Sequence, residues 1–324
     1  MTETMNRIKI DPTNKAATRE AYGKTLVEMG KESTDIVVLD ADLSGSTQTK
    51  HFAKEFPERF FNMGIAESNM VCTAAGLARA GKIPYASSFA MFAAGRAWEL
   101  VRNSVAHNYL NVNICATHSG ITVGEDGATH QIIEDIAIMR VIPTMNVFVP
   151  ADSCETAQII RAVAKIDAPC YVRLGRAKVP EVTGEIPDYT FEPGKANILK
   201  EGKDVTIIAC GVTVAPALEA AYQLEDEHGI SAEVINCASI KPLDSETIAK
   251  SASKTGKVLS VEEHNVIGGL GDAVASVIAE DVDSAVKLKK QGIQDCFGQS
   301  GKAEDLLDHY GLNTSTIVEL AKAL

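Results

Sequence analysis

The sequence predicts an α/β protein of two domains, each built on a doubly wound, open parallel sheet. Three observations support this class. Short runs rich in β-branched residues alternate with longer helical patterns in the first half of the chain, as they do when helices cover both faces of a parallel sheet. That rhythm stops at 176–200 and resumes in the second half. A chain of 324 residues is also too long for one compact core.

The first block contains four strand-like and four helix-like segments. Strands are expected at 35–40, 111–117, 145–150 and 170–174, and helices at 66–80, 95–108, 131–140 and 152–166. Asp152 precedes the last helix, and Glu155 stands in its first turn. This is the pattern of a capped helix N-terminus, so the sequence fixes the start of that helix better than the others.

The segment 176–200 contains three prolines and predicts a connector between domains. We therefore expect a first domain over 1–185 and a second over 186–324. In the second block, strands are expected at 205–211, 232–237 and 257–263, and helices at 214–228, at 245–254 and in the final "TSTIVELAKAL".

Composition and charge exclude several classes of protein. A net charge of −12 argues against a nucleic-acid partner, because binding phosphates along a strand needs a basic surface. The seven cysteines form no C-x-x-C pair, which favours a reducing compartment. The N-terminus lacks the apolar core of a signal peptide, and no apolar run approaches the ~20 residues of a membrane span. We expect a soluble, cytoplasmic protein without membrane contact.

Glu67, in "FNMGIAESNM", begins the predicted helix 66–80 with a carboxylate. The positions that share its helical face are all small or apolar: Met70, Val71, Ala74, Ala75 and Ala78. That face is expected to pack inward. A buried carboxylate is costly unless a specific partner satisfies it, so the sequence predicts such a partner for Glu67.

The segment "ATHSGITVGEDGATHQ" places His118 and His130 on either side of a Gly-rich turn that contains Glu125 and Asp126. It follows a predicted strand and therefore belongs at the carboxyl end of the sheet, where open α/β sheets bind ligands. Imidazoles beside acids suit acid–base chemistry or anion binding. A surface loop with incidental histidines remains open. A metal site is less favoured, because the histidines are twelve residues apart.

Three further segments allow a structural and a functional interpretation. Phe89 and Phe92 are either core aromatics or an apolar wall for a flat heteroaromatic ring. Arg173 and Arg176 are either solvated or a fork for a phosphate. The turn at 39–47 either presents hydroxyls and amides to a ligand or caps the next helix.

Several catalytic motifs are absent from the sequence. It contains no phosphate-binding G-x-x-x-x-G-K-[ST], no G-x-S-x-G and no H-E-x-x-H. The glycines of "VEEHNVIGGLGDA" lack the G-x-G-x-x-G order of dinucleotide-binding proteins. We interpret them as close packing of a helix on a strand or as a turn, and not as a cofactor site.

Taken together, the motifs resemble the C-terminal half of transketolases. The following segments occur in the order found there: "ATREAYG", "DADLSGS", "NMGIAESNM", "SSFAMF", "THSGITVGEDGATHQ" and "VRLGR". The resemblance extends over essentially the whole chain from Ala17. It implies the pyrimidine-binding domain of thiamine diphosphate enzymes followed by the transketolase C-terminal domain.

Full-length transketolases have a further N-terminal domain, in which a G-D-G motif and a later Asn hold Mg²⁺ and the cofactor diphosphate. This chain has no G-D-G. It therefore resembles the smaller subunit of a split transketolase, whose N-terminal half is a separate polypeptide. The resemblance implies an α₂β₂ heterotetramer, with thiamine diphosphate shared between subunits and Mg²⁺ held mainly by the partner. We expect no metal ligands on this chain.

The resemblance also implies cofactor contacts. Glu67 matches the glutamate that faces N1′ of the aminopyrimidine ring and so promotes proton loss from the thiazolium carbon. Phe89 and Phe92 match aromatics that line the ring pocket, and Gly95 stands where some relatives have a third aromatic residue. Asp42 matches an acid near the thiazolium side. The ring nitrogen would be the partner that Glu67 needs.

The substrate contacts follow in the same way. His130 and Asp126 match residues that handle substrate hydroxyls, and His130 is the second candidate catalytic residue beside the cofactor acid. Four residues match the group that binds the terminal phosphate of the sugar: Arg19, Ser46, His118 and Arg176. Ser119 departs from the family, because many transketolases have Asp there; this bears on the substrate assignment and not on the cofactor assignment.

The expected function is transfer of a two-carbon ketol unit between sugar phosphates, by an enzyme that is active only with its N-terminal partner. A 1-deoxyxylulose-5-phosphate synthase-like protein is an alternative, because it shares a D-G-x-T-H-Q-like segment. A 2-oxo acid dehydrogenase β-like subunit is another alternative, although such a subunit would not need residues that bind a substrate phosphate. A non-catalytic binding or regulatory module is the alternative from a different class.

Overall fold

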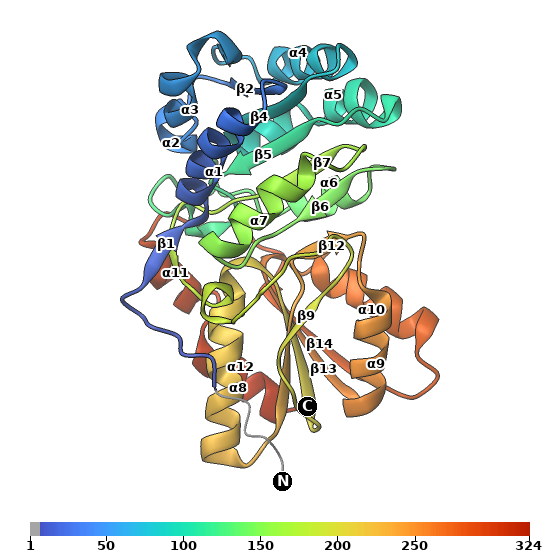
Figure 1. Ribbon diagram of the computed structural model, residues 1–324. Helices are drawn as coiled ribbons and strands as arrows, with labels where there is room; N and C mark the ends of the chain where they lie inside the picture. Colours follow the sequence, from blue (N-terminus) through green and yellow to red (C-terminus); the bar gives the residue numbers. More distant parts are fainter. Residues whose placement is uncertain (1–6) are drawn as a thin grey trace.

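The computed structural model describes residues 7–324 and arranges them as two α/β units, the first drawn in blue to green and the second in yellow to red (Figure 1). A short antiparallel pair, β1 (Lys15–Ala17) with β8 (Lys178–Pro180), joins the start of the first unit to the segment that leaves it. The α/β class with two open sheets is confirmed. Within residues 7–324, no helix is both long and apolar enough to cross a membrane.

The first unit contains a seven-stranded sheet in the order β12-β6-β7-β5-β4-β2-β3. Its strands are β2 (Ile36–Asp40), β3 (Phe60–Asn62), β4 (Ile83–Phe89), β5 (Asn113–Thr117), β6 (Asn146–Phe148), β7 (Cys170–Arg173) and β12 (Ser239–Lys241). All neighbours are parallel except β12, which comes from the second unit and runs antiparallel to β6. The second unit thereby completes the edge of the first sheet.

Helices cover both faces of this sheet. One face carries α1 (Thr18–Glu32), α3 (Lys50–Glu55) and α7 (Ser153–Val163), which pack through Tyr22, Phe52 and Ile160. The other face carries α4 (Glu67–Arg79) and α6 (Asp135–Arg140), which pack through Met70 and Ile136. Short turns complete the unit: α2 (Ser44–Thr47), η1 (Pro57–Arg59), η5 (Ile121–Val123) and η6 (Thr183–Glu185). Strand residues alternate between the two cores, as the pleat requires.

The segment predicted as a helix at 95–108 is helical, but most of it is not α-helix. The segment instead forms the π-helices η2 (Met91–Arg96) and η3 (Val101–Val105), with α5 (Trp98–Leu100) between them and the 3₁₀ turn η4 (Ala106–Asn108) after them. Hydrogen bonds from residue i to i+5 widen the helix, and such segments are frequent at functional sites. The apolar spacing that predicts an α-helix does not reveal this change.

Other elements of the first unit were missed or shortened. Helix α1, strand β3 and the central strand β4 were not predicted from the sequence. The helix expected at 131–140 begins only at Asp135, because the preceding residues are held in a loop in which the Gly120 amide donates to the Ile132 carbonyl. The expected cap of α7 is confirmed, since the Asp152 side chain accepts from the Glu155 amide at 3.0 Å.

The second unit contains a five-stranded sheet in the order β14-β13-β10-β11-β9. Its strands are β9 (Asn197–Lys200), β10 (Val205–Ala209), β11 (Ala232–Asn236), β13 (Lys257–Asn265) and β14 (Lys287–Ile293). Only β9 is antiparallel to its neighbour. Because β9 lies within 176–200, part of the expected connector is a strand of this sheet. The sequence patterns did not predict β14 either.

Helices also cover both faces of the second sheet. On one face lie α8 (Val214–His228) and α12 (Thr314–Lys322), and on the other lie α9 (Ser245–Thr255) and α10 (Leu270–Asp281) (Figure 1). The remaining elements are η7 (Gly211–Thr213) and α11 (Ala303–His309). One apolar cluster continues from the α4 face of the first sheet to the α9–α10 face of the second, so the two units share a core.

The glycines between β13 and α10 confirm the packing interpretation. A Cβ atom on Gly269 would lie 2.0 Å from a carboxylate oxygen of Glu262, and one on Gly271 would lie 2.8 Å from the Ser260 hydroxyl. Both distances are too short for a side chain. Only glycine therefore allows the first turn of α10 to lie directly over β13.

Candidate active site

The predicted site segments meet at the carboxyl edge of the first sheet. The loops after β7, β5, β4 and β2 leave neighbouring strands of this sheet at the same edge, where α/β proteins place their ligands. Helix α4 begins there too, after β3. Four sequence segments that lie far apart in the chain are thereby brought together.

Glu67 is the first residue of α4, and its side chain is 2% exposed. Arg96, the last residue of η2, donates from one guanidinium nitrogen to both carboxylate oxygens, at 3.0 and 3.1 Å. The same guanidinium lies 4.8 Å from the centre of the Phe92 ring. Glu67 is therefore buried and has a specific partner, and within this chain the partner is Arg96.

Two phenylalanines and two histidines form one stacked group beside Glu67. The ring of Phe89 stacks on His118 with centroids 3.8 Å apart, and on Phe92 at 6.1 Å. His130 meets the Phe92 ring edge-on at 5.5 Å. Phe89 is 8% exposed at the end of β4, whereas Phe92 is half-buried on η2. The four rings combine an apolar wall with two imidazoles.

Positive charge gathers next to His118. Burial is the largest cause that lowers the pKa of His118 to about 3, and the charges of Arg19, Arg176 and His130 add to it. Arg19 donates to the Ser46 carbonyl at 2.8 Å, and its Nε finds no hydrogen-bond partner within residues 7–324. A neutral imidazole beside two guanidinium groups is suited to bind an anion.

The salt bridge of Arg176 leaves it available for a ligand. It contacts Glu125 at 3.1 Å, and the Glu125 side chain is 67% exposed. Arg176 also donates to the Val123 carbonyl. An exposed ion pair of this kind contributes little to stability and is readily exchanged for a ligand.

The two predicted aspartates lie at the surface. Asp42 is exposed, adopts a left-handed backbone with φ of 64°, and accepts from the Asn62 amide at 3.3 Å. Buried Asp40 organises the same turn by accepting from the Leu43 amide at 2.6 Å. Asp126 is exposed on the loop after β5, four residues before His130. Both are accessible to a ligand above the sheet edge.

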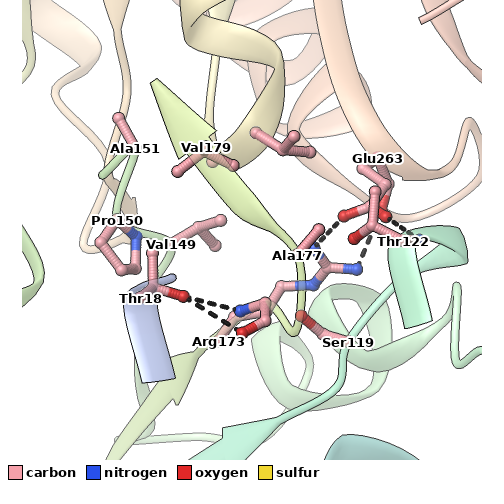
Figure 2. A pocket seen from close by; sticks show the side chains of 13 residues that line it. Thr18, Ser119, Thr122, Val149, Pro150, Ala151, Arg173, Ala177, Val179 and Glu263 are labelled. Atoms are coloured by element: carbon pink, nitrogen blue, oxygen red, sulfur yellow. Dashed lines mark hydrogen bonds and ion pairs between the residues drawn. The ribbon is translucent and has the colours of Figure 1, made fainter. Parts of the chain in front are cut away.

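Arg173 does not lie with the cationic group around His118, and it is not solvated either, so neither of the two interpretations of the pair applies to it. Arg173 is buried at the end of β7, and its Nε donates to the Asp135 carboxylate at 2.9 Å. On its other side it faces Glu263 of the second unit at 3.4 Å (Figure 2). Strand alternation turns Arg173 into the space between the units, whereas Arg176 lies beyond the strand.

The space around Arg173 is a small cavity of about 20 Å³ between the units. It is lined by residues of both, among them Thr18, Ser119, Thr122, Val179 and Glu263 (Figure 2). Ser119 donates its hydroxyl to the Leu174 carbonyl at 2.9 Å and so connects the loop after β5 to the end of β7. Ser119 and Thr122 belong to the loop that carries His118 and His130, so this loop forms part of the cavity wall.

Two important side chains were not singled out from the sequence, namely Arg96 and Glu263. Arg96 stands four residues after Phe92, a spacing that places both side chains on one side of a helix. That signal was available. Glu263 gave none, because its contact depends on how the second unit sits against the first. Within residues 7–324, no group of three or more His, Cys, Asp or Glu side chains is placed to hold a metal ion.

These features define a two-domain α/β protein with a ligand site at the carboxyl edge of its first sheet. Two family models match it: the transketolase pyrimidine binding domain over residues 14–181 and the transketolase C-terminal domain over residues 194–317. The chain belongs to the transketolase family, and it contains two of that family's domains.

The relatives include proteins of the same length and longer ones. A Methanocaldococcus jannaschii protein described as a transketolase C-terminal section is 56% identical over 93% of this chain and 94% of its own length. A 6-deoxy-6-sulfo-D-fructose transketolase subunit of a Clostridium species is 42% identical over 94% of this chain and 92% of its own. Mouse transketolase is 37% identical over 96% of this chain, which spans 49% of the mouse protein.

Solved structures agree with this relationship. One is described as a split gene transketolase in an inactive beta4 tetramer; it is 55% identical, has a TM-score of 0.85, and the match covers 95% of this chain and 97% of that one. Transketolase from Campylobacter jejuni matches with a TM-score of 0.82 and 25% identity over all of this chain and 49% of its own.

Proposed function

We propose that this chain is the C-terminal subunit of a thiamine diphosphate-dependent transketolase that transfers a two-carbon ketol unit between sugar phosphates. One observation carries the proposal. A carboxylate that is 2% exposed lies beside a stacked aromatic wall, next to a group of cationic side chains at the carboxyl edge of a sheet. Family membership alone would not require these side chains to come together.

The residues present fit the aminopyrimidine half of the cofactor. Glu67, which Arg96 already contacts, would also hydrogen-bond to ring nitrogen N1′ and hold a proton there. Phe89 and Phe92 would pack on the ring and exclude water, and Asp42 lies on the side expected for the thiazolium ring. When bound, the cofactor would supply carbanion chemistry that no protein side chain can provide.

The cationic group fits the terminal anion of the substrate. Within residues 7–324 the Arg19 Nε has no hydrogen-bond partner. The acid paired with Arg176 is exposed, and neutral His118 can donate one hydrogen bond. Ser46 supplies a hydroxyl beside Arg19. His130 and Asp126 would bind sugar hydroxyls, with His130 moving the proton during cleavage of the carbon–carbon bond.

The chemistry of the anion leaves the sugar itself open. Guanidinium groups bind phosphate or sulfonate oxygens, and relatives named for 6-deoxy-6-sulfo-D-fructose and for apulose-4-phosphate are 42% and 39% identical to this chain. We favour phosphorylated sugars, because a dianion uses both arginines. A panel of phosphorylated and sulfonated ketoses would rank the donors.

A second chain is part of the proposal. We infer that an N-terminal transketolase subunit supplies the G-D-G segment, which binds the diphosphate and Mg²⁺, in a cytoplasmic α₂β₂ assembly. Family-model matches to two transketolase domains, and similarity to a split-gene structure, support this inference. We further propose that the chain divides into domains over 1–185 and 186–324. An adjacent reading frame with G-D-G and a later Asn would identify the partner.

Reconstitution with that partner tests the function. The two chains, thiamine diphosphate and Mg²⁺ should convert xylulose 5-phosphate and ribose 5-phosphate, and Glu67→Ala should lower turnover on the order of 10²–10⁴-fold. Glu99→Ala, which removes an exposed acid from the neighbouring α5, should leave it unchanged. Full activity of Glu67→Ala would refute the proton role. Condensation of pyruvate with glyceraldehyde 3-phosphate instead would favour the deoxyxylulose alternative.

A further inference from the structure

Glu263 belongs to the second unit but contacts the loop that carries the candidate catalytic residues of the first. Its carboxylate accepts a hydrogen bond from the Thr122 backbone amide at 2.7 Å (Figure 2). Thr122 lies in η5, between His118 and His130. Glu263 is 4% exposed, so this contact is shielded from water. One buried side chain of the second unit therefore fixes the start of the loop.

The loop is shaped to receive this carboxylate. Gly120 has φ of 72°, and a Cβ atom there would lie 2.2 Å from the carboxyl carbon of Glu263. Any other residue would displace the acid. His118, two residues earlier, has φ of 58°, so the backbone turns sharply between the stacked imidazole and the contact with Glu263. A shift of the Glu263 carboxylate would therefore move Gly120 and, through two peptide bonds, the backbone of His118.

Charge explains why Glu263 needs the loop. Arg173 is buried between two acids, donating to Asp135 at 2.9 Å and facing the Glu263 side chain at 3.4 Å. One guanidinium cannot neutralise two buried carboxylates, and burial is the largest cause that raises the pKa of Glu263. The Thr122 amide supplies the missing donor. The buried acid is satisfied only when the loop is in place.

A second contact holds the other end of the loop. The Gln131 side-chain amide donates to the carbonyl of Gln299 in the second unit at 2.9 Å, and to that of Gly124 at 3.1 Å. A Cβ atom on Gly298 would lie 2.0 Å from the Gln131 side-chain oxygen. The second unit therefore contacts the loop 120–131 near both of its ends, close in sequence to His118 and His130.

We propose that Glu263 is a positioning residue through which the second domain fixes loop 120–131 and thereby sets the positions of His118 and His130 toward substrate. Only the role of that loop in binding sugars rests on the proposed function. The role of the C-terminal domain is then to hold this loop, since none of its side chains is among the candidate cofactor- or substrate-binding residues. Glu263 acts through its hydrogen bond to the Thr122 backbone amide.

Two conservative substitutions separate positioning from charge. Glu263→Asp keeps the charge but withdraws the carboxylate by one carbon–carbon bond, roughly 1.5 Å, which breaks the hydrogen bond to Thr122. Glu263→Gln keeps the acceptor for Thr122 and loses the charge. The matched control is Glu262→Asp, since Glu262 is equally buried on the same strand but caps α10 by accepting from the Leu270 amide at 2.7 Å.

Hydrogen exchange of the complete chain, without cofactor or partner, is the first measurement. Glu263→Asp should raise amide exchange in 119–131 by about tenfold or more and leave the cores of both units protected, whereas Glu263→Gln should exchange as the unmodified chain does. Glu262→Asp should loosen the start of α10 only. Unchanged exchange of 119–131 in Glu263→Asp, or loosening spread over both units, would overturn the proposal.

The second measurement uses the reconstituted enzyme. Glu263→Asp should lower kcat/KM for the sugar phosphate by about 10- to 100-fold, while thiamine diphosphate affinity stays within about twofold, and Glu263→Gln should restore most of the activity. Equal loss of cofactor affinity would contradict positioning. If no sugar transfer is found but loop exchange responds as expected, the contact stands and the proposed function fails. Transfer with an unresponsive loop would refute only the positioning role.

Discussion

At the scale of single residues, Glu67 and Arg96 form an unequal pair. The Glu67 side chain is 2% exposed and the Arg96 side chain 53% exposed, so the acid depends on the arginine more than the reverse. Arg96 also lies over the Phe92 ring, a favourable place for a cation. In this chain, the guanidinium contacts both the acid and the aromatic face that the aminopyrimidine ring would need.

Arg96→Met should therefore destabilise the chain through Glu67. Because the guanidinium is half-exposed, we expect the free energy of unfolding to fall by about 1–2 kcal/mol rather than by the full cost of an unpaired buried charge. In a Glu67→Gln background the loss should be less than half as large. Urea unfolding at pH 7 gives both values, with Arg102→Met, on the exposed side of η3, as the control. Equal losses in the two backgrounds would show that the residues are uncoupled.

His118 makes stability depend on pH. Its pKa falls from 6.5 in the unfolded chain to about 3 in the folded one, mainly through burial. Between these values the unfolded state binds more protons, so stability falls as the pH is lowered from 6.5 toward 3.

His118→Asn should remove much of that dependence, and Asn tolerates the left-handed backbone at this position. Between pH 7 and pH 5, the unmodified chain should lose about 2 kcal/mol more stability than the variant. Urea unfolding at the two pH values measures the difference. His51→Asn, at an exposed histidine of α3, should behave like the unmodified chain. Identical pH profiles for His118→Asn and the unmodified chain would rule out a depressed pKa.

At the scale of elements, the start of α7 is held by more than a helix cap. Asp152 accepts from the Glu155 amide, and its other oxygen accepts from the Val182 amide at 2.8 Å and the Thr183 amide at 2.5 Å. One buried carboxylate thus ties the helix to the segment that leaves the first unit.

Asp152→Ala should cost about 3–5 kcal/mol, because it removes the cap and leaves two buried amides without acceptors. Asn313→Ala removes an ordinary cap, in which the side chain accepts from one backbone amide, that of Thr316, and should cost about 1 kcal/mol. Thermal or urea unfolding of both variants tests the comparison. Losses of similar size would mean that Asp152 acts only as a cap.

At the scale of the whole molecule, the two units share an apolar core and the buried ion pairs of Arg173 with Asp135 and Glu263. The candidate site lies at the carboxyl edge of the first sheet. Described residues provide the acid, the aromatic wall and the cationic group, and none of the residues 7–324 forms a metal centre. In the proposed function, the N-terminal partner holds the diphosphate of the cofactor.

The purified chain should therefore show no ketol transfer with thiamine diphosphate and Mg²⁺, and its affinity for the cofactor should be weak. Addition of the N-terminal partner should restore both, as measured by calorimetry and by a coupled assay of glyceraldehyde 3-phosphate. Substantial turnover by the highly purified chain alone would contradict the dependence on a partner.

Much of this arrangement could be predicted from the sequence. The bounds of α8 were predicted without error, because its apolar face, preceding strand and following glycine all agree. The burial of Glu67 followed from helical spacing. In contrast, β14 has a charged, half-buried pattern, and the four residues of β9 follow a segment with several prolines, so neither resembles a central strand. Arg173 and Arg176 look alike in sequence and have opposite environments.

The sequence by itself determined the α/β class, the family resemblance, the inward-facing acid and the motifs that follow each strand, because these depend on local spacing along one element. Only the tertiary structure decided that Arg96 pairs with Glu67, that Arg173 is buried between two acids, and that Glu263 supports the loop from the second unit. Those contacts join segments far apart in the chain, and their geometry depends on how sheets and units pack. Local patterns carry no information about that packing.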